Sequence, residues 1–202
     1  MTETNKPDAG AHGGDALLVV DLQRDFLPGG ALAVPGGDQV VPPLQRCLAL
    51  FAERGRPIFM TRDWHPADHC SFEASGGPWP AHCVAGTPGA DFPQALRIPG
   101  GTHVVSKGTD PRVEAYSAFS DPDLCERLRR LGIRRLTVGG LATDYCVLQT
   151  VLDALSCGFD VRVMTDAVAA VDVEPGDGAR ALQRMQSAGA GLTTSARVLS
   201  SS

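Results

Sequence analysis

Cys146 is a residue whose local sequence could give it a chemical role. It ends the stretch LTVGGLATDYC, residues 136–146, in which a short apolar run leads into two glycines and a polar turn. This order is typical of a buried strand that passes into a helix, with the cysteine near the helix N-terminus. The helix dipole at such a position can lower the pKa of a thiol from its ordinary value of about 8.5. The alternative is an apolar cysteine of the core, since free cysteines are often buried.

Asp21 and Lys107 also follow short apolar runs, and Asp63 lies two residues beyond another. Ligands of open α/β sheets bind outside the carboxyl ends of the strands, where residues of this kind would meet. Asp21, with a pKa raised by burial, could take the proton of the Cys146 thiol, and Lys107 could hold the pair by its charge. Taken singly, an aspartate after a strand is more often a turn or cap residue, and a lysine is more often a solvated charge. No histidine lies near Cys146 in sequence, so a Cys–Asp–Lys arrangement fits the strand ends better than a Cys–His pair.

A second group of residues has the types and spacing of a metal site. Asp63 and His65 are two apart on a segment expected to be extended, so they point to the same side, and His82 returns on a long loop. Three protein ligands leave coordination positions open, as in catalytic sites, whereas a single histidine is more often a hydrogen-bonded surface residue. Oxygen and nitrogen donors suit Zn²⁺, Fe²⁺ or Mn²⁺ without choosing among them. His69 is either a fourth ligand or a hydrogen-bonding partner of a ligand.

The elements that must position these residues alternate between strands and helices. Short apolar runs predict six strands, at residues 16–20, 57–61, 103–106, 134–139, 161–164 and 191–194. Apolar residues at helical spacing, bounded by proline, aspartate or glycine, predict helices at residues 40–54, 121–131, 143–156 and 175–188. Residues 71–99 form a Gly- and Pro-rich stretch without periodicity, and a loop of that length is usually functional.

This alternation predicts an α/β fold: a single three-layer domain with a mostly parallel sheet of about six strands, flanked by helices. The length of 202 residues suits one domain, residues 15–202, after a polar, disordered tail at residues 1–14. A net charge of −5 without a basic stripe argues against a nucleic-acid partner, and no apolar run is long enough to cross a membrane. The tail has no features of a secretory signal, so the six cysteines suggest reduced thiols and a cytoplasmic protein.

Five segments together resemble the nicotinamidase (pyrazinamidase) branch of the isochorismatase-like cysteine hydrolases, over residues 16–194. The first and last segments below belong to the wider superfamily, whereas the DWH and WPxHC motifs mark its metal-binding branch. The segments are VVDLQRDFLPGGALAV (19–34), TRDWHPADHCSF (61–72), GGPWPAHCVAGTPGADF (76–92), SKGTDPRVEAYSAF (106–119) and GGLATDYCV (139–147).

The resemblance assigns roles to residues of this chain. It implies a catalytic triad, an oxyanion hole formed by the backbone N–H groups of Ala142 and Cys146, and a cis peptide bond between Leu141 and Ala142. His69 follows His65 at a shorter spacing than the fourth ligand of some members, which leaves its ligation open. The implied triad is Asp21, Lys107 and Cys146, the implied metal ligands are Asp63, His65 and His82, and the implied pocket residues are Phe26, Leu32, Trp79 and Tyr116, with Gln23 near them.

The resemblance also implies an activity. We expect hydrolysis of nicotinamide to nicotinate and ammonia through a cysteine thioester, with pyrazinamide also accepted. One divalent metal per chain is expected, zinc first and iron or manganese as alternatives, in a homo-oligomeric enzyme of NAD salvage. Another cysteine amidase, acting on a carbamoyl or ureido compound, is the nearest alternative. An isochorismatase is disfavoured by the presence of Cys146, and a non-catalytic binding module would be expected to lack part of the triad or the ligands.

Overall fold

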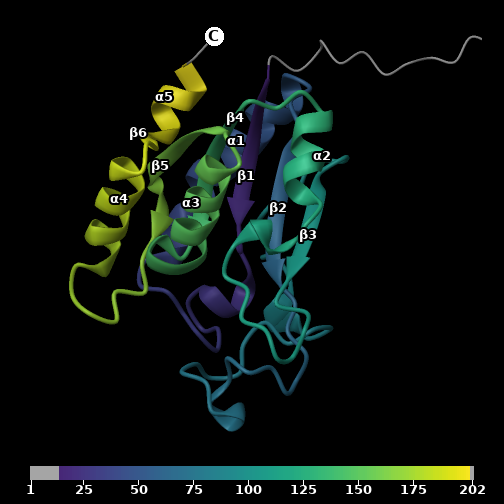
Figure 1. Cartoon of the computed structure of the whole chain (residues 1–202), viewed down its shortest axis with the longest axis vertical. Coiled ribbons are helices and arrows are strands. Elements are labelled where there is room, and N and C mark those ends of the chain that lie inside the picture. Colours follow the sequence, from purple (N-terminus) through teal and green to yellow (C-terminus); the bar gives the residue numbers. More distant parts are fainter. Residues whose placement is uncertain (1–13, 201–202) are drawn as a thin grey trace, which may run out of the picture.

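The protein contains one six-stranded sheet in which every neighbouring pair of strands is parallel (Figure 1). The computed structural model describes residues 14–200. The predicted parallel sheet is confirmed, whereas the predicted tail lies outside the described residues except for Gly14, whose carbonyl accepts N–H bonds from Arg134 and Arg135. In chain order the strands are β1 (Asp15–Val20), β2 (Ile58–Asp63), β3 (His103–Lys107), β4 (Arg135–Leu141), β5 (Asp160–Ala169) and β6 (Gly191–Thr193).

Helices cover both faces of the sheet and complete the predicted three layers. One hydrophobic cluster joins the sheet to α1 (Val41–Glu53) and α5 (Ser195–Ser200). The other joins it to α2 (Leu124–Arg130), α3 (Leu148–Ser156) and α4 (Asp177–Ser187). Within residues 14–200, none of these helices has the length and apolar character needed to cross a membrane.

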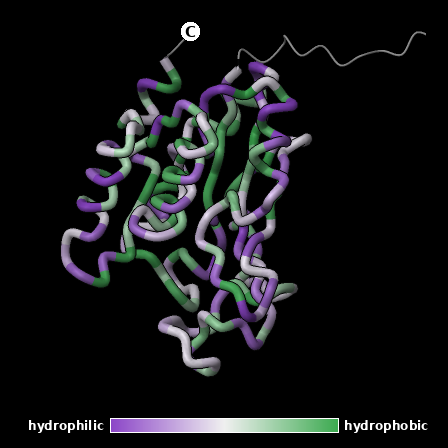
Figure 2. Tube along the Cα trace, in the orientation of Figure 1, coloured by the Kyte–Doolittle hydropathy of each residue, from purple (hydrophilic) through white to green (hydrophobic). Residues whose placement is uncertain are grey.

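The central strand β1 is buried on both sides, as its uninterrupted apolar sequence predicts. Leu17 and Val19 belong to one hydrophobic cluster, whereas Leu18 and Val20 belong to the other. Figure 2 shows this pattern as hydrophobic strands in the middle of the molecule, with hydrophilic positions along the outer sides of the helices. The alternation of side chains along the strand therefore supplies both core layers.

Three elements differ most from the sequence prediction: β5, α5 and the helix predicted at residues 143–156, whose first five residues form a π-helical turn before α3 begins at Leu148. Strand β5 continues to Ala169, past the predicted end at residue 164. The prediction stopped early because the polar pair Thr165–Asp166 interrupts the apolar run of the strand. The short helix α5 was not predicted. Its first residue, Ser195, donates from its backbone N–H and its hydroxyl to the carboxylate of Asp166. A six-residue helix gains little stability from the helix propensity of its residues. The contact with Asp166 stabilises α5 instead, and the local sequence does not reveal that contact.

The connection between β2 and β3 is long and largely irregular, as predicted. It contains the short 3-10 turns η3 (Glu73–Ser75) and η4 (Pro88–Ala90), and isolated bridges join His65 to Val84 and Phe72 to Trp79. Further 3-10 turns are η1 (Arg24–Phe26), η2 (Gly37–Val40) and η5 (Ala118–Ser120). Much of this connection lies beyond the carboxyl ends of the strands, below the sheet in Figure 1. It contains two of the predicted metal ligands, His65 and His82.

The order of the strands, β3-β2-β1-β4-β5-β6, places a topological switch point between β1 and β4. The chain starts in the middle of the sheet, builds outward through β2 and β3, and then returns to build the other half. Connections on the two sides of a switch point leave in opposite directions, which opens a crevice at the carboxyl ends of the strands. Asp21 follows β1 and Cys146 follows β4, so both lie at this crevice.

Candidate active site

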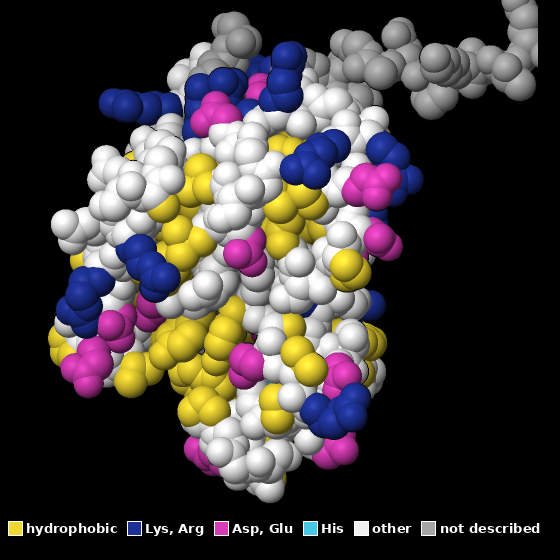
Figure 3. Space-filling view, viewed as in Figure 1, with side chains coloured by type: hydrophobic (Ala, Val, Ile, Leu, Met, Phe, Trp, Pro, Cys, Tyr) yellow, Lys and Arg dark blue, Asp and Glu magenta, His cyan; other side chains and the backbone are white. Residues whose placement is uncertain are grey.

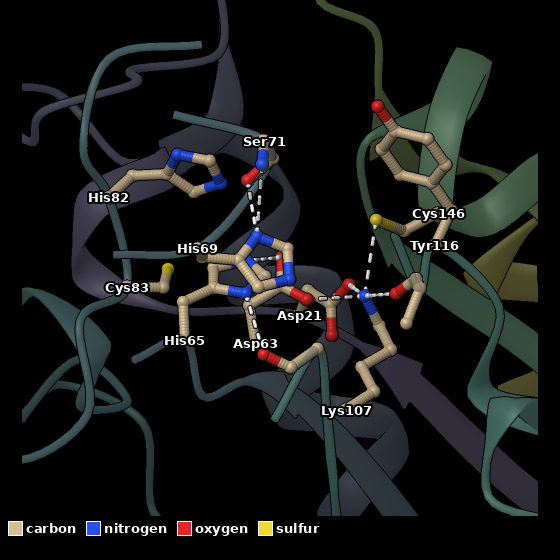
Figure 4. A network of polar contacts seen from close by, with 12 residues as sticks. Asp21, Asp63, His65, His69, Ser71, His82, Cys83, Lys107, Tyr116 and Cys146 are labelled. Carbon is tan, nitrogen blue, oxygen red and sulfur yellow. Dashed lines mark hydrogen bonds and ion pairs between the residues drawn. The ribbon is translucent and has the colours of Figure 1, made fainter. Parts of the chain in front are cut away.

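Lys107, the last residue of β3, lies at the centre of the site, and its side chain has no exposed area. Its Nζ lies 2.8 Å from Asp21 Oδ2, 2.6 Å from Asp63 Oδ1 and 3.4 Å from Cys146 Sγ (Figure 4). It also donates to the carbonyl of Ala115. The structure thus brings together the three residues of the predicted triad, from the ends of β1 and β3 and the turn after β4, together with the predicted ligand Asp63.

The carboxylate of Asp21 is completely buried and is arranged to accept a proton. Burial raises its pKa above the ordinary range, and the nearby Asp63 adds to the rise, while Lys107 opposes it. Its Oδ1 accepts a hydrogen bond of 2.6 Å from the hydroxyl of Thr61. Its Oδ2 meets Lys107 as an ion pair but has no partner in hydrogen-bond geometry among the described residues. This oxygen therefore has lone pairs available for the thiol proton.

Cys146 is buried, and its surroundings favour the thiol over the thiolate. Burial raises its pKa well above the ordinary value, and Asp21 and Asp63 reinforce the rise, while the attraction of Lys107 is too small to reverse it. The expectation of a lowered pKa is wrong, because burial is the largest effect on this thiol and it raises the pKa. Cys146 also lies in a π-helical turn, η6 (Thr143–Val147), and the α-helix begins only at Leu148. The thiol consequently needs a base, and Asp21 is in place for that role.

The turn before Cys146 has the predicted backbone. The peptide bond between Leu141 and Ala142 is cis, as the resemblance implied. The carbonyl of Ala142 accepts the N–H groups of Tyr145 and Val147, which fixes the path of the turn. The oxyanion hole itself, formed by the N–H groups of Ala142 and Cys146, stays a prediction.

Asp63, His65 and His82 form a group that fits a divalent metal. All three are buried, and one ligand atom from each lies within 4.8 Å of the others. His65 Nδ1 faces the carbonyl of Gly108 at 3.0 Å, and His82 Nδ1 faces the carbonyl of Pro80 at 2.8 Å. A backbone carbonyl that holds one ring nitrogen leaves the other free to coordinate, which is the usual support of a metal-binding histidine.

The protonation states of Asp63 and His82 suit a cation, whereas the adjacent Asp63 outweighs burial and raises the pKa of His65. Burial alone would raise the pKa of Asp63, but Lys107 and His65 outweigh burial and hold it well below its ordinary range. Burial lowers the pKa of His82, which favours the neutral imidazole that coordinates metals. The group therefore presents a carboxylate and at least one neutral imidazole to the space between its members.

His69 lies beside this group but makes other contacts. Its Nδ1 is 2.7 Å from the hydroxyl of Ser71, and its Nε2 is 3.2 Å from the carbonyl of Val113. Its ring centre lies 4.2 Å from that of His65. Both nitrogens face groups other than the ligands, so His69 packs its ring against His65, and its contacts match neither of the two roles left open by the sequence.

A pocket opens beside Cys146 and Asp63. The four predicted pocket residues all line it, but Gln23 does not: its side chain is buried behind the pocket and bonds to the backbone of Asp63. Hydrophobic side chains also gather on the surface between α3 and the lower loops (Figure 3). The residues that line the pocket are Phe26, Leu32, Val34, Asp63, Trp79, His82, Tyr116, Ala142, Tyr145, Cys146 and Val171.

Aromatic contacts shape one wall of this pocket. Trp79 donates its indole N–H to the hydroxyl of Tyr116 at 3.1 Å, and its ring meets Tyr145 edge-on at 5.0 Å between ring centres. Burial raises the pKa of Tyr116 to about 12, so its phenol stays neutral. Such a wall suits a flat aromatic ligand.

Sequence reasoning missed three residues of the lining, Val34, Tyr145 and Val171. Tyr145 precedes Cys146 directly and could have been found from that position. Val171 follows β5, and its place depends on a distant contact, because the carboxylate of Asp144 accepts its N–H and that of Asp172. No local signal predicts that contact.

Comparison with known proteins shows what the whole chain is similar to. The model of the isochorismatase domain matches residues 15–197. The chain is similar to the nicotinamidase of Escherichia coli (strain K12), with 43% identity over 200 residues, covering 89% of this chain and 94% of that protein.

Two solved structures are also similar. The pyrazinamidase of Pyrococcus horikoshii in complex with zinc has a TM-score of 0.85 and 48% identity, covering 90% of this chain and 99% of that one. PnC1 of L. infantum in complex with nicotinate has a TM-score of 0.83 and 36% identity, covering 90% of this chain and 93% of that one. The similarity extends over nearly all of the described fold.

Proposed function

This chain belongs to the isochorismatase family, and we propose that within it the protein is a nicotinamidase, which hydrolyses nicotinamide to nicotinate and ammonia and also accepts pyrazinamide. The observation that carries the proposal is the meeting of two groups in one aromatic pocket. Cys146 lies beside Asp21 and Lys107, and Asp63 joins this cluster to the histidines of the metal-binding group. A cysteine amidase for carbamoyl compounds would need the first group alone.

The first half of the reaction forms a thioester. Oδ2 of Asp21 takes the proton of the Cys146 thiol, and the thiolate attacks the carboxamide carbon of the substrate. The tetrahedral oxyanion is held by the proposed N–H donors of Ala142 and Cys146, and each donor of this kind is worth about 2.7–4 kcal/mol. Asp21 then returns the proton to the leaving nitrogen, ammonia departs, and the acyl group stays on sulfur.

The second half releases the acid. Water attacks the thioester while Asp21 accepts one of its protons, and the carbon–sulfur bond breaks to give nicotinate. The proton returns to Cys146 and restores the thiol. Lys107 keeps its charge throughout, because Asp21 and Asp63 raise its pKa well above the ordinary value despite burial. Its role is to hold the two carboxylates and the sulfur in position.

The pocket fixes the position of the pyridine ring. Phe26 and Trp79 line it, and Tyr116 and Tyr145 extend the aromatic wall. We propose that Asp63, His65 and His82 hold one zinc ion, with iron or manganese as alternatives. When bound, such an ion supplies a positive charge and an open coordination position for the ring nitrogen or a water molecule. Holding the ring in this way places the carboxamide beside Cys146, so the substrate loses its translational and rotational entropy on binding and not in the chemical step.

We further propose a cytoplasmic, homo-oligomeric enzyme that acts in the salvage of pyridine nucleotides. The proposed reaction supports a role in this salvage pathway, because its product, nicotinate, keeps the pyridine ring of the nucleotides. The cysteines of the described chain are all free thiols, which supports a reducing compartment.

An ammonia-release assay tests the activity. The substrates are nicotinamide, pyrazinamide, benzamide and a ureido compound, and the metal content is measured on the same sample. We expect rapid turnover of the first two amides and much slower turnover of benzamide, which has no ring nitrogen. Preference for the ureido compound would support the other amidase function, and no release by metal-loaded protein would refute catalysis.

A further inference from the structure

Two side chains that the mechanism does not use hold the ends of β1 and β2 together. The hydroxyl of Thr61, in β2, accepts the backbone N–H of Asp21 at 3.1 Å and donates to its Oδ1 at 2.6 Å. Thr61 is completely buried, and Asp21 has a left-handed backbone conformation with a φ of 44°. A non-glycine residue in this region of φ needs support from its surroundings, and Thr61 gives that support at both the backbone and the carboxylate.

Gln23, which follows β1, supports the backbone of Asp63 at the end of β2. From the segment after β1, its Oε1 accepts the backbone N–H of Asp63 at 2.7 Å, and its Nε2 donates to the carbonyl of Asp63 at 2.8 Å. The same Nε2 donates to the carbonyl of Ala90, in η4 of the long connection. Gln23 is completely buried, and both donors of its amide are used, so it has no N–H group left for a substrate.

These contacts begin where the backbone pairing of the two strands stops. The register of β1 and β2 ends at Val19 and Met60, and the side-chain bonds join Thr61, the next residue of β2, to Asp21, two residues after Val19. Asp21 and Asp63 then meet on the same Lys107 Nζ, at 2.8 and 2.6 Å. The β1–β2 pairing does not extend to Asp21 or Asp63, so side chains join the two residues across this strand pair, while the backbone of Asp63 also pairs with Lys107 of β3.

We propose that Thr61 and Gln23 form a reciprocal clamp, in which Thr61 positions the general base Asp21 and Gln23 positions the metal ligand Asp63. Neither residue lines the pocket, so both act through the carboxylates they hold. The inference rests on the proposed function, and it predicts that the two halves of the clamp fail in different ways. Loss of the Thr61 contacts impairs proton transfer, whereas loss of the Gln23 contacts impairs metal binding.

The test of the first half replaces Thr61 with valine, which has nearly the same shape but no hydroxyl. We expect Thr61→Val to lower kcat by about 10–100-fold, with KM and metal content close to those of the wild type. Thr61→Ser keeps the hydroxyl and should restore most of kcat. A purely structural role would not produce this rescue together with an unchanged KM.

The test of the second half uses Gln23→Met, which preserves length without the amide. We expect the zinc affinity to fall by about 10–100-fold, measured by competition with a chelator in the absence of substrate. The zinc affinity of Thr61→Val should stay within a few-fold of the wild type.

Thr137→Val is the matched control for removing a buried hydroxyl from the same sheet, because Thr137 is buried in β4 before the turn that carries Cys146. Its kcat, KM and zinc affinity should equal those of the wild type. Should either clamp variant fail to fold, Thr61→Ala, which also lacks the hydroxyl, and Gln23→Glu, which lacks the amide N–H donors, provide the same comparison.

Two results separate this inference from the proposed function. If the zinc-loaded wild type released no ammonia from nicotinamide, the proposed function would fail. If the wild type were active but Thr61→Val matched it in kcat, or Gln23→Met matched it in zinc affinity, the reciprocal clamp would be wrong.

Discussion

At the scale of single residues, the site consists of charges removed from water. Asp21, Asp63 and Lys107 are buried, and two carboxylates share one ammonium group. Burial acts to raise the pKa of both aspartates, and it prevails for Asp21, whereas for Asp63 the attraction of Lys107 and the nearby His65 outweighs it and holds the pKa low. The two aspartates are thereby separated into a proton acceptor and a permanently charged ligand, a division of roles that environment alone can impose.

The pH dependence of Cys146 alkylation follows from its environment. A raised pKa means that the thiol is protonated at neutral pH, so the thiolate fraction should grow about tenfold per pH unit. Alkylation of the free enzyme by iodoacetamide should therefore keep rising from about pH 6 to about pH 9, as followed by mass spectrometry of the Cys146 peptide. A plateau reached below about pH 8 would mean that the thiol has a lowered pKa and would contradict this expectation.

Removing the thiol tests the nucleophile directly. Cys146→Ala should abolish ammonia release from nicotinamide, because no thioester can form. Its metal content should equal that of the wild type, since Cys146 is not part of the Asp63, His65 and His82 group. Turnover of the variant near the wild-type rate would contradict the assignment.

At the scale of elements, β4 and the turn after it set the position of the nucleophile. Gly140 has a φ of 125°, and a Cβ added there would overlap the backbone of Val20 in β1. The close approach of β1 and β4 at this point is what places Asp21 next to the turn with Cys146. A register irregularity between β4 and β5 occurs at the same place, between Val138 and Gly140.

Gly140→Ala should therefore destabilise the fold. The added methyl group meets backbone atoms, which cannot move as a flexible side chain would, and the positive φ adds strain of about 1–3 kcal/mol. We expect the free energy of unfolding in urea to fall by at least about 2 kcal/mol. Gly100→Ala is the control, since nothing lies within 4 Å of a Cβ at that position, and it should stay within about 0.5 kcal/mol of the wild type.

At the scale of the whole molecule, topology brings separate parts of the chain to one crevice. The switch point between β1 and β4 places Asp21 beside the turn with Cys146, and the connection after β2 adds His65 and His82. Asp25 anchors this connection to the segment after β1, because its Oδ2 accepts the N–H of Cys83 at 2.7 Å. The metal-binding group thus joins the sheet to the long loop below it.

Removal of the metal should affect both stability and binding. A ligand that binds only the folded state at a free concentration 100 times its Kd adds about 2.7 kcal/mol of stability. Chelator-treated protein should therefore have a lower Tm and a weaker affinity for nicotinate by calorimetry. Alkylation of Cys146 should change much less, because Lys107 and Asp21 remain in place. Full activity in protein shown to be free of metal would refute the role of the group.

Sequence alone determined the elements and the chemical types at their ends. Apolar runs and helical spacing depend on local residues, so they predicted the six strands and the helices that form two layers. Strand ends and motifs likewise identified Asp21, Lys107, Cys146 and the three residues of the metal-binding group, because residue type and order along the chain are enough to recognise them.

Tertiary structure alone decided how these residues behave. The pKa of Cys146 depends on burial by distant segments, and this burial reversed the expectation from its position near a helix. Gln23 faces Asp63 instead of the pocket, and both nitrogens of His69 have other partners. Val171 and α5 depend on the carboxylates of Asp144 and Asp166. Distances between residues far apart in sequence arise only when the sheet is assembled, and electrostatic and hydrogen-bond energies depend on those distances.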